Sequence, residues 1–462
     1  MNAEKRTRSG RRLVFAGVVP ALLALLAGCK GIPTAGERLA RAELQSVGES
    51  LRPGGAVVLP ELSTNAPFTN FLTYAMLNQP KVVAAYHDWA ASVQRITIER
   101  SLPDPKLTFE SDIADVVMTV MPGLMQEFPG PGKLKAAANL ATAESRTKYF
   151  AFEDAVLQTA FALKQSYYQL WSLDEKVRIN RQMLGLLQEL EQIARAQNEV
   201  GKVTLQDVYR AQIEREQLTT EIANLEDSRG PVLARFKGAL GLTPAQPDPP
   251  LPAPFATTPL TLNGDELLAT AFARNPRLAA MRADVQMAEA AIAMARKSKV
   301  PDFSLGLMAD AKASPTMYRP QASMTLPIWR DKIAAEIAAA QANQRAAAAR
   351  LNAEQIMVAV DFAMKAYDYR EATRTLTLLE EQLIPKAAQS LEIARAGYLG
   401  GQIDFFNLLD AERALLNFQL AAVEARTRRE IALADISLSI AGLPPEGAPL
   451  LPAADSSHSH VH

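Results

Sequence analysis

The chain has 462 residues, of which 48% are apolar and 21% charged, and its formal net charge is −1. This near-balance argues against a nucleic-acid-binding protein. The single cysteine excludes an internal disulfide and a cysteine metal cluster. Only His87 among the histidines lies outside the C-terminal tail, and no group of carboxylates has the pattern of an active site. We therefore expect neither an enzyme nor a cofactor.

The first 28 residues have the pattern of a signal peptide. Five lysine and arginine residues precede an apolar run, Leu13 to Ala27, which is short for a membrane span. Leu26-Ala27-Gly28-Cys29 follows and resembles a bacterial lipoprotein signal. This resemblance makes Cys29 the lipid-modified first residue of the mature protein, and Lys30 after it points to the outer membrane. The alternative is an incidental thiol beside an ordinary signal peptide.

Residues 29–68 are rich in Gly, Pro, Ser and Thr, and we predict an extended arm that leaves the lipid anchor. From Asn70 to Ser101 the apolar residues have the spacing of a helix. The prolines of Leu102-Pro103-Asp104-Pro105 should end this helix.

The remaining chain has the pattern of a tandem duplication. Gly201 to Ala211 returns as Gly401 to Ala411. Further matches are Pro80 with Pro276, Leu102-Pro103-Asp104 with Val300-Pro301-Asp302, Phe128-Pro129 with Leu326-Pro327, and Gly241-Leu242 with Gly442-Leu443. The offset drifts only from 196 to 201 residues. We predict two copies, 69–242 and 263–443, a proline-rich linker, 243–262, and a tail, 444–462.

Each copy contains two segments with the two-residue period of a strand. In the first, Leu107, Phe109 and Ile113 alternate with polar residues, and a second strand should run from about Val117 to Phe128. In the second copy the alternating apolar residues are Phe303, Leu305, Leu307 and Ala309, then Tyr318, Ala322, Met324 and Leu326. Strands of about ten residues cross a bilayer when tilted.

A long helical stretch follows each strand pair. Lys133 to Val200 contains no proline, so a continuous helix would be on the order of 100 Å long. Asp331 to Ala396 contains Pro385, which should kink or break the helix. Each stretch ends at glycine, and the returning helix has apolar residues at coiled-coil spacing. These seam residues are Ala211, Leu218, Ile222 and Leu225 in the first copy, and Leu409, Leu416, Leu420 and Val423 in the second.

Four strands are too few to close a membrane-spanning barrel, and open strand edges are not tolerated in lipid. The chain must therefore share strands with copies of itself, and three subunits would supply about twelve. We predict a mainly α-helical protein with a shared transmembrane β-barrel. Phe128, Tyr318 and Trp329 near the strand ends are candidates for an interfacial aromatic belt, with core packing as the alternative.

In this order, and duplicated, the motifs resemble the TolC family of trimeric outer-membrane efflux channels. The resemblance is carried by Asn275-Pro276, Val300-Pro301-Asp302, Leu326-Pro327, Gly401 to Ala411, and Ala441-Gly442-Leu443-Pro444. It implies a homotrimer with a twelve-stranded β-barrel in the outer membrane and a helical α-barrel below it. It also implies a periplasmic adaptor and an inner-membrane efflux pump as partners.

The resemblance further implies a periplasmic gate, because the family's α-barrel closes at the hairpin tips, where acidic side chains converge. The family's pattern of Asp, two apolar residues, Asp and Ala falls on Asn407 to Ala411. Asp410 is retained, whereas Asn407 replaces the first carboxylate, and Asp404 and Asp207 are further candidates. Converging like charges would favour cations and raise one another's pKa. The alternative is that these carboxylates are helix caps or solvated surface charges.

The turns Gly201-Lys202 and Gly400-Gly401 resemble the tips at which the family's adaptor docks. Capping of the preceding helices is a simpler role for these glycines.

Two features concern metal ions. The segments Ser101 to Pro105 and Phe128 to Leu134 resemble the heavy-metal branch of the family. His458, His460 and His462 alternate in the tail and could bind a divalent ion. The alternative for these histidines is a disordered polar end.

We therefore expect the outer-membrane channel of a tripartite efflux system, with heavy-metal cations as one candidate substrate class. The alternative is a lipid-anchored periplasmic coiled-coil adaptor or scaffold, whose strands would belong to a soluble domain. The two differ in whether the protein forms a trimeric, conducting pore.

Overall fold

The computed structural model describes residues 32–51, 58–114, 117–251, 264–310 and 316–443. Contacts within the chain divide it into two units. Unit 1 consists of Met1–Arg41, Val93–Thr142 and Ala290–Ala338, and unit 2 of Ala42–Ser92, Ala143–Glu289 and Ala339–His462. Cys29, most of the predicted linker, and the tail with His458, His460 and His462 lie outside the described residues.

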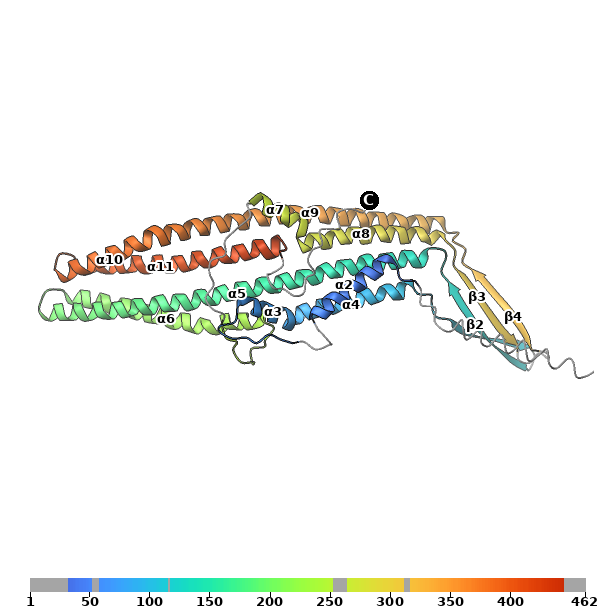
Figure 1. Cartoon of the computed structure of the whole chain (residues 1–462), viewed down its shortest axis with the longest axis horizontal. Coiled ribbons are helices and arrows are strands. Elements are labelled where there is room, and N and C mark those ends of the chain that lie inside the picture. The colour runs from blue at the N-terminus through green and yellow to red at the C-terminus, as the bar shows by residue number, and fades with distance from the viewer. Residues whose placement is uncertain (1–31, 52–57, 115–116, 252–263, 311–315, 444–462) are drawn as a thin grey trace, which may run out of the picture. The chain divides into compact units, whose positions relative to one another are not determined.

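Unit 1 contains one antiparallel sheet in the order β1-β2-β3-β4 (Figure 1). Its strands are β1 (Lys106–Ala114), β2 (Val117–Phe128), β3 (Phe303–Asp310) and β4 (Met317–Met324). Lys106 of β1 pairs with Met125 of β2. The residues 198 positions after these two, Ser304 of β3 and Ser323 of β4, also pair with each other. The duplication therefore extends to the residue pairing within each hairpin, as expected for two copies of one strand pair.

One face of this sheet is apolar and exposed. Leu107 and Phe109 of β1 and Leu305 and Leu307 of β3 expose 47–66% of their surface. Met308, which points to the opposite face of β3, is buried. The predicted alternation is confirmed at these positions, and the apolar side of the sheet is the uncovered one.

The aromatic residues near the strand ends are also exposed. Trp329 exposes 72% of its surface, and Tyr318 and Phe128 are exposed as well. The core-packing alternative is therefore wrong within the described chain.

Two long helical hairpins follow the strand pairs (Figure 1). The first consists of α5 (Lys133–Glu199), with 67 residues, and α6 (Leu205–Ala239). The second consists of α9 (Arg330–Leu378), the π-helical turn η3 (Leu379–Leu383), α10 (Ile384–Leu399), α11 (Phe405–Ala434) and the π-helical turn η4 (Asp435–Ile440). At 1.5 Å per residue α5 is roughly 100 Å long. None of the described helices is both long and apolar enough to cross a bilayer.

The chain accommodates Pro385 with an irregular helical turn instead of a break. The Ile384 N–H donates to Leu379 O, five residues back, and Pro385 lies in the first turn of α10. A proline lacks an N–H and is tolerated where that donor would have no helical acceptor. The wider π-turn therefore lets α9 continue into α10.

The returning helices form the predicted seams. Ala211, Leu218, Ile222, Leu409 and Val423 are buried, and Leu225, Leu416 and Leu420 are half-buried. Residues of α5, α6, α10 and α11 share one apolar core cluster at the tip half of the hairpins, including Leu190, Leu391 and Leu408. The heptad prediction is thus confirmed, and the two hairpins of one chain stabilise each other.

Each copy begins with two helices separated by one residue. Gln79 separates α3 (Phe68–Asn78) from α4 (Pro80–Arg100), and Asn275 separates α7 (Gly264–Arg274) from α8 (Pro276–Arg296), which the short 3-10 helix η2 (Lys297–Lys299) follows. The single helix predicted from Asn70 to Ser101 is therefore wrong. The residue before a proline is driven out of the helical conformation, and Gln79 is extended.

Both copies end in a glycine that packs against the interruption between the first two helices of that copy. Gly241 and Gly442 have left-handed φ values of 75° and 62°. A Cβ on Gly241 would lie 2.7 Å from Asn78 O, and a Cβ on Gly442 would lie 2.7 Å from Arg274 O. Only glycine satisfies both the dihedral angle and the close approach, which explains why Gly-Leu recurs at these two places.

Helix α2 (Ala35–Leu51) corrects the extended arm predicted for residues 29–68. Thr34 begins this helix, because its hydroxyl accepts a hydrogen bond from the Glu37 N–H (3.1 Å). The Gly and Ser content of the segment suggested a loop, but such residues are tolerated in a helix that packs against others.

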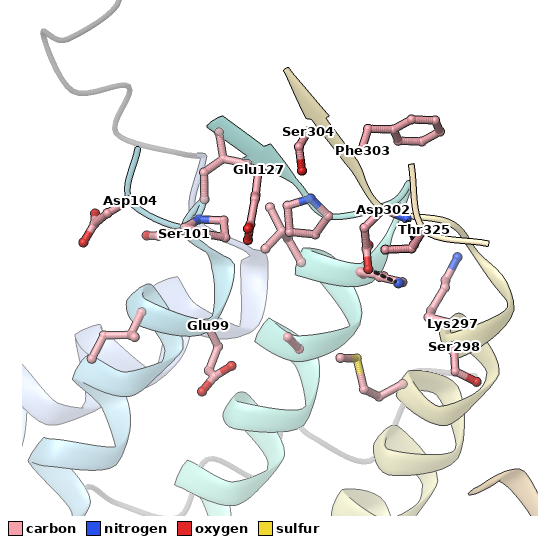
Figure 2. Close-up of a pocket in the computed structure, with 18 of the residues that line it drawn as sticks. Glu99, Ser101, Asp104, Glu127, Lys297, Ser298, Asp302, Phe303, Ser304 and Thr325 are labelled. Atoms are coloured by element: carbon pink, nitrogen blue, oxygen red, sulfur yellow. Dashed lines mark hydrogen bonds and ion pairs between the residues drawn. The ribbon is translucent and has the colours of Figure 1, made fainter. Parts of the chain in front are cut away.

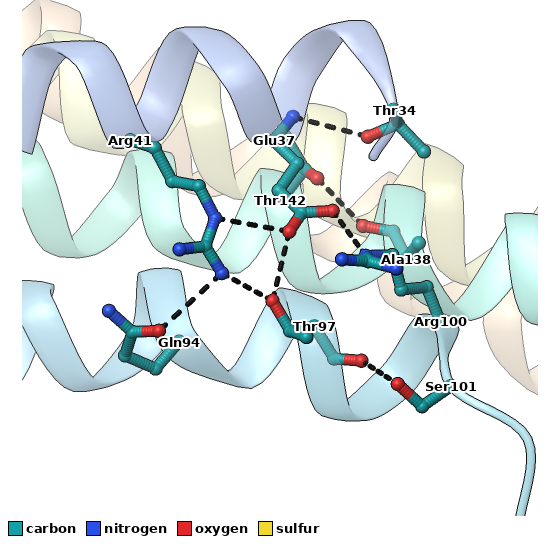
Figure 3. Close-up of polar contacts among 9 residues, drawn as sticks. All are labelled: Thr34, Glu37, Arg41, Gln94, Thr97, Arg100, Ser101, Ala138 and Thr142. Carbon is teal, nitrogen blue, oxygen red and sulfur yellow. Dashed lines mark hydrogen bonds and ion pairs between the residues drawn. The ribbon is translucent and has the colours of Figure 1, made fainter. Parts of the chain in front are cut away.

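Buried polar contacts hold α2 against α4 (Figure 3). Glu37 is fully buried, and its Oε1 accepts from Arg41 Nε (3.1 Å) and Thr97 Oγ1 (2.9 Å). Glu37 Oε2 accepts from Arg100 Nε (2.7 Å). Burial alone would raise the pKa of Glu37, but the hydrogen bonds from Thr97, Arg100 and Arg41 outweigh it and lower that pKa. Two of the partners are 60 or more residues away in sequence, so a local pattern does not indicate them.

Candidate functional site

The first hairpin turns between α5 and α6. Lys202 N–H donates to Gln197 O (2.9 Å) across the left-handed Gly201 (φ 75°), which ends α5 in a Schellman motif. Asp207 Oδ2 then accepts hydrogen bonds from the N–H (3.2 Å) and the hydroxyl (2.9 Å) of Thr204, the N-cap of α6. Gly201 and Lys202 are exposed at the tip.

The second hairpin turns in the same way. Gln402 N–H donates to Gly397 O (2.8 Å) across Gly401, whose φ is 72°. Asp404 is the N-cap of α11, and its Oδ1 accepts from the Asn407 N–H (2.8 Å). Gly400 has a φ of −79°, which any residue adopts. Of the two exposed glycines here, backbone geometry therefore requires only Gly401.

Asp207 and Asp404 both take part in capping the start of a helix, as the alternative to a gate role predicted. A capping carboxylate can also contribute to a gate. Asp404, Asn407 and Asp410 are all exposed on the first two turns of α11, whereas Leu408 is buried. Within the described residues neither Asp404 nor Asp410 forms an ion pair. These three side chains are therefore exposed on the surface of the second hairpin in the single chain.

Asp207 has a different environment from Asp404 and Asp410. Its Oδ1 lies 3.7 Å from Arg210 Nη1, and its side chain is half-buried. Burial and the charge of Asp207 raise the pKa of Tyr398 to about 12. The buried Tyr398 hydroxyl has no hydrogen-bond partner in the described part of the chain. Asp207 therefore has its partners within its own turn and helix, and its charge acts on Tyr398 of α10.

Sequence reasoning missed a buried acid near the tip. Glu412 of α11 exposes only 2% of its surface. Burial and the charge of Glu214, opposed by Arg413, raise the pKa of Glu412 to about 8. The available signal was its position, because Glu412 follows Leu409 by three residues and so occupies a seam position of the heptad pattern.

Unit 1 has a pocket of about 1070 Å³ where the strands meet the helices (Figure 2). Its lining includes Asp104 and Glu127 from the first copy and Lys297 and Asp302 from the second. Asp302 Oδ1 accepts from the Gly130 N–H (2.7 Å), and Oδ2 accepts from Lys133 Nζ (2.8 Å).

These hydrogen bonds dominate the electrostatics of Asp302. Burial would raise the pKa of Asp302, but the hydrogen bonds from Lys133 and Gly130 outweigh it and lower the pKa below its usual value. The carboxylate is therefore charged at neutral pH and joins the two copies of the repeat at the base of the sheet.

The family model for outer membrane efflux proteins matches residues 72–242 and 267–442, which is more than half of the chain. The chain belongs to the outer membrane efflux protein family. The two matched segments lie within the two copies predicted from the sequence and confirm the family resemblance.

A distant relative of this outer membrane efflux protein is a metal-resistance protein. The cobalt-zinc-cadmium resistance protein CzcC of Cupriavidus metallidurans is 23% identical over 272 residues, which are 55% of this chain and 61% of CzcC. The match thus spans less than two thirds of that relative.

Solved structures resemble the chain over more of its length. The outer membrane protein VceC of Vibrio cholerae is 18% identical, with a TM-score of 0.68 over 81% of this chain and 96% of VceC. The open state of the outer membrane channel MtrE of Neisseria gonorrhoeae is 17% identical, with a TM-score of 0.69 over 83% of this chain and 95% of MtrE. These likenesses show that the efflux protein has the fold of TolC-type channels.

Proposed function

We propose that this protein is the outer-membrane channel of a tripartite efflux system. It conducts substrates passively from an inner-membrane pump and a periplasmic adaptor to the exterior. Family membership supports an efflux role in the outer membrane.

The observation that carries the proposal is the sheet of unit 1. It exposes an apolar face, and its edge strands β1 and β4 have no paired strand on their outer sides within the described chain, where Gln321 Nε2 of β4 and Glu110 Oε2 of β1 make a side-chain contact of 3.5 Å. Lipid covers an apolar face but does not satisfy an open strand edge. Three copies joined edge to edge supply about twelve strands and remove every edge. The functional unit is therefore a homotrimer with a shared β-barrel.

The hairpin tips form the periplasmic end of this channel in our proposal. Asp404, Asn407 and Asp410 are exposed on α11, so that copies related by a threefold axis could present them to one another. Like charges that converge in this way repel anions and favour cations.

The adaptor docks on the outside of the tips in the same proposal. Gly201, Lys202, Gly400 and Gly401 are exposed there and leave the backbone accessible. A Cβ on Gly201 or Gly401 would meet no atom within 4 Å, so these surfaces are open in the single chain.

Lipid attachment and substrate complete the proposal. Cys29 follows a lipoprotein-type signal and would anchor the mature chain in the outer membrane. Similarity to a cobalt-zinc-cadmium resistance protein favours divalent heavy-metal cations as substrates. His458, His460 and His462 would then offer a weak metal site on the tail.

A reconstitution experiment tests the function. Protein extracted from outer membranes should migrate as a trimer in SDS without heating and should produce single-channel currents in planar bilayers. A lipidated monomer without current would instead support the periplasmic adaptor. A strain that lacks the protein should become more sensitive to cobalt, zinc or cadmium, and unchanged sensitivity to all three would remove these ions as substrates.

A further inference from the structure

We infer that Asp104 forms an ion pair with Arg330 of a neighbouring copy of this chain. This pair repeats, between subunits, the Asp302–Lys133 pair that joins the two halves of one chain. The inference rests on the proposed homotrimer and specifies residues and register at its sheet junction.

The internal pair supplies the template. Lys133 is the first residue of α5, the helix that follows β2, and Asp302 immediately precedes β3. Their ion pair (2.8 Å) therefore lies where β2 ends and β3 begins, at the junction between the first copy of the repeat and the second. Lys133 is mostly buried there, so the contact is part of the packed junction.

The duplication gives each member a counterpart. Because the two strand hairpins have the same register at an offset of 198 residues, Asp104 occupies the position of Asp302. Arg330 is the first residue of α9, as Lys133 is of α5, although the two are 197 residues apart and the offset of 198 residues falls on Asp331. A carboxylate just before the first strand and a cation at the start of the following helix thus recur in both copies.

Within one chain these two counterparts belong to opposite edges of the sheet. Asp104 precedes β1 and Arg330 follows β4, and these are the first and last strands of the sheet. Both side chains are exposed, and neither forms an ion pair among residues 32–51, 58–114, 117–251, 264–310 and 316–443. Figure 2 shows Asp104 on the far side of the pocket from Asp302. A second copy, joined at the sheet edge, is the occupant that brings the opposite charges together.

The same template predicts the strand register at that junction. Leu124 of β2 lies opposite Leu307 of β3. The residue 198 positions after Leu124 is Ala322 of β4, and the residue 198 positions before Leu307 is Phe109 of β1. Ala322 should therefore lie opposite Phe109 of a neighbouring copy.

Two prolines set the length of the predicted pairing. The β2–β3 pairing stops at Gly123, beside Pro122, and Pro320 lies 198 positions further along. Since proline cannot donate to a ladder, the intersubunit pairing should likewise stop at Gln321, opposite Glu110 of the neighbour.

A buried hydroxyl bears on this register. Thr108 Oγ1 of β1 lies over Gly123 of β2 and is buried without a hydrogen-bond partner in the described structure. In β2–β3 Met125 lies opposite Gly306, and the same offset places Ser323 opposite Thr108 of a neighbouring copy. A Thr–Ser pair across two strands is a stabilising hydrogen-bonded pair, and it would satisfy this hydroxyl once the Thr108 side chain turns from Gly123 towards the neighbouring strand.

The backbone hydrogen bond of the template is not copied either. Gly130 N–H donates to Asp302, and a Cβ at Gly130 would lie 2.3 Å from Pro301 O. The corresponding turn has Ile328, whose N–H donates to Leu326 O (2.9 Å). The intersubunit junction therefore contains the ion pair without the backbone hydrogen bond.

Charge exchange tests the pair. Asp104→Arg and Arg330→Asp should each lower the temperature at which the SDS-resistant trimer dissociates, by roughly 2–4 °C. The double variant should recover most of that loss. Asp104→Arg combined with Lys332→Asp is the matched control, because it makes the same charge changes two residues away in α9, and it should recover nothing. Equal behaviour of the two double variants would overturn the pair.

A disulfide tests the register. Ser323→Cys with Thr108→Cys should give a covalent trimer under oxidising conditions, whereas Ser323→Cys with Glu110→Cys, two residues out of register, should not. Gln321 Nε2 lies 3.5 Å from Glu110 Oε2 within one chain, so an intrachain disulfide is the competing product, and it would run as a monomer.

The outcomes separate this inference from the proposed function. An SDS-resistant, conducting trimer that forms only monomeric or out-of-register disulfides overturns the inference and leaves the channel intact. A wild-type protein that is monomeric and passes no current overturns both.

Discussion

Glu412 illustrates how the coiled-coil seam changes a single side chain. It is buried beside Glu214 and Arg413, and its pKa is raised from about 4.5 to about 8. Between these values the folded chain holds a proton that the unfolded chain releases. Unfolded protein then binds fewer protons, so stability is greatest below about pH 4.5 and falls as the pH rises towards 8.

Replacing Glu412 with glutamine should remove this pH dependence. Because the neutral amide has no proton to lose, Glu412→Gln should stabilise the fold at pH 8 by about 1–3 kcal/mol and change it little at pH 4.5. Thermal unfolding followed by helical circular dichroism at both pH values measures the difference. Glu221→Gln, at an exposed position of α6, is the control. Equal effects of the two variants at pH 8 would contradict the assignment.

Asp410 belongs to the same helix but is exposed. If copies of Asp410 hold the closed tips, Asp410→Ala should raise the leak current through the closed channel several-fold, since a ring of three carboxylates is lost. Planar-bilayer recording of the closed state measures this change. Asp227→Ala removes an exposed carboxylate of α6 away from the tip and should leave the current unchanged. An unchanged current in Asp410→Ala would remove this residue from the gate.

At the scale of elements, α2 depends on contacts with another helix, α4. Glu37 is buried against Thr97 and Arg100 of α4, and these hydrogen bonds stabilise a helix with no other side-chain cap than Thr34. A buried carboxylate of this kind is costly to disrupt, because removal of one partner leaves the opposite charges without compensation.

Glu37→Gln should therefore release α2 from α4 before the rest of the chain unfolds, at a cost of about 3 kcal/mol. Hydrogen exchange of α2 amides, or tryptic cleavage after Arg38 and Arg41, should accelerate in the variant. Glu49→Gln, at an exposed position of the same helix, provides the control and should exchange like the wild type. If both variants remain equally protected, Glu37 does not anchor the helix.

At the scale of the whole molecule, the sheet carries the argument for the proposed trimer. Its apolar face and its two edges are incompatible with a lone chain in water or in lipid. In the proposed trimer, assembly into a ring would provide partners for both edges, and the membrane would cover the apolar face. The alternating strands would then separate two environments, lipid outside and the lumen inside.

Substitutions on the two faces should therefore have opposite results. Leu305→Arg places a charge on the apolar face and should cost roughly 1–4 kcal/mol per subunit in the membrane, greatly reducing the trimer recovered from outer membranes. Ser304→Arg, one residue away on the other face, should assemble normally. The ratio of trimer to monomer on unheated SDS gels measures both. Normal assembly of Leu305→Arg would contradict a lipid-facing role.

The sequence by itself determined what depends on neighbouring residues. The alternating strands near Leu305, the long helices and the left-handed Gly201 and Gly401 follow from periodicity and backbone geometry, which act over a few residues. The duplication was also visible, because two copies of one unit repeat the same local requirements. Even the recurring Gly-Leu at Gly241 was found, although its reason, a close contact with Asn78, was not.

Tertiary structure decided whatever depends on partners far along the chain. Helix α2 forms because Glu37 meets Arg100, and the acid at Glu412 is neutral because other helices exclude water from it. The pairing of β2 with β3, and with it the ion pair of Asp302, joins segments from different copies. The sequence next to these residues has no pattern that predicts such contacts, because burial and charge pairing arise only when separate elements pack together.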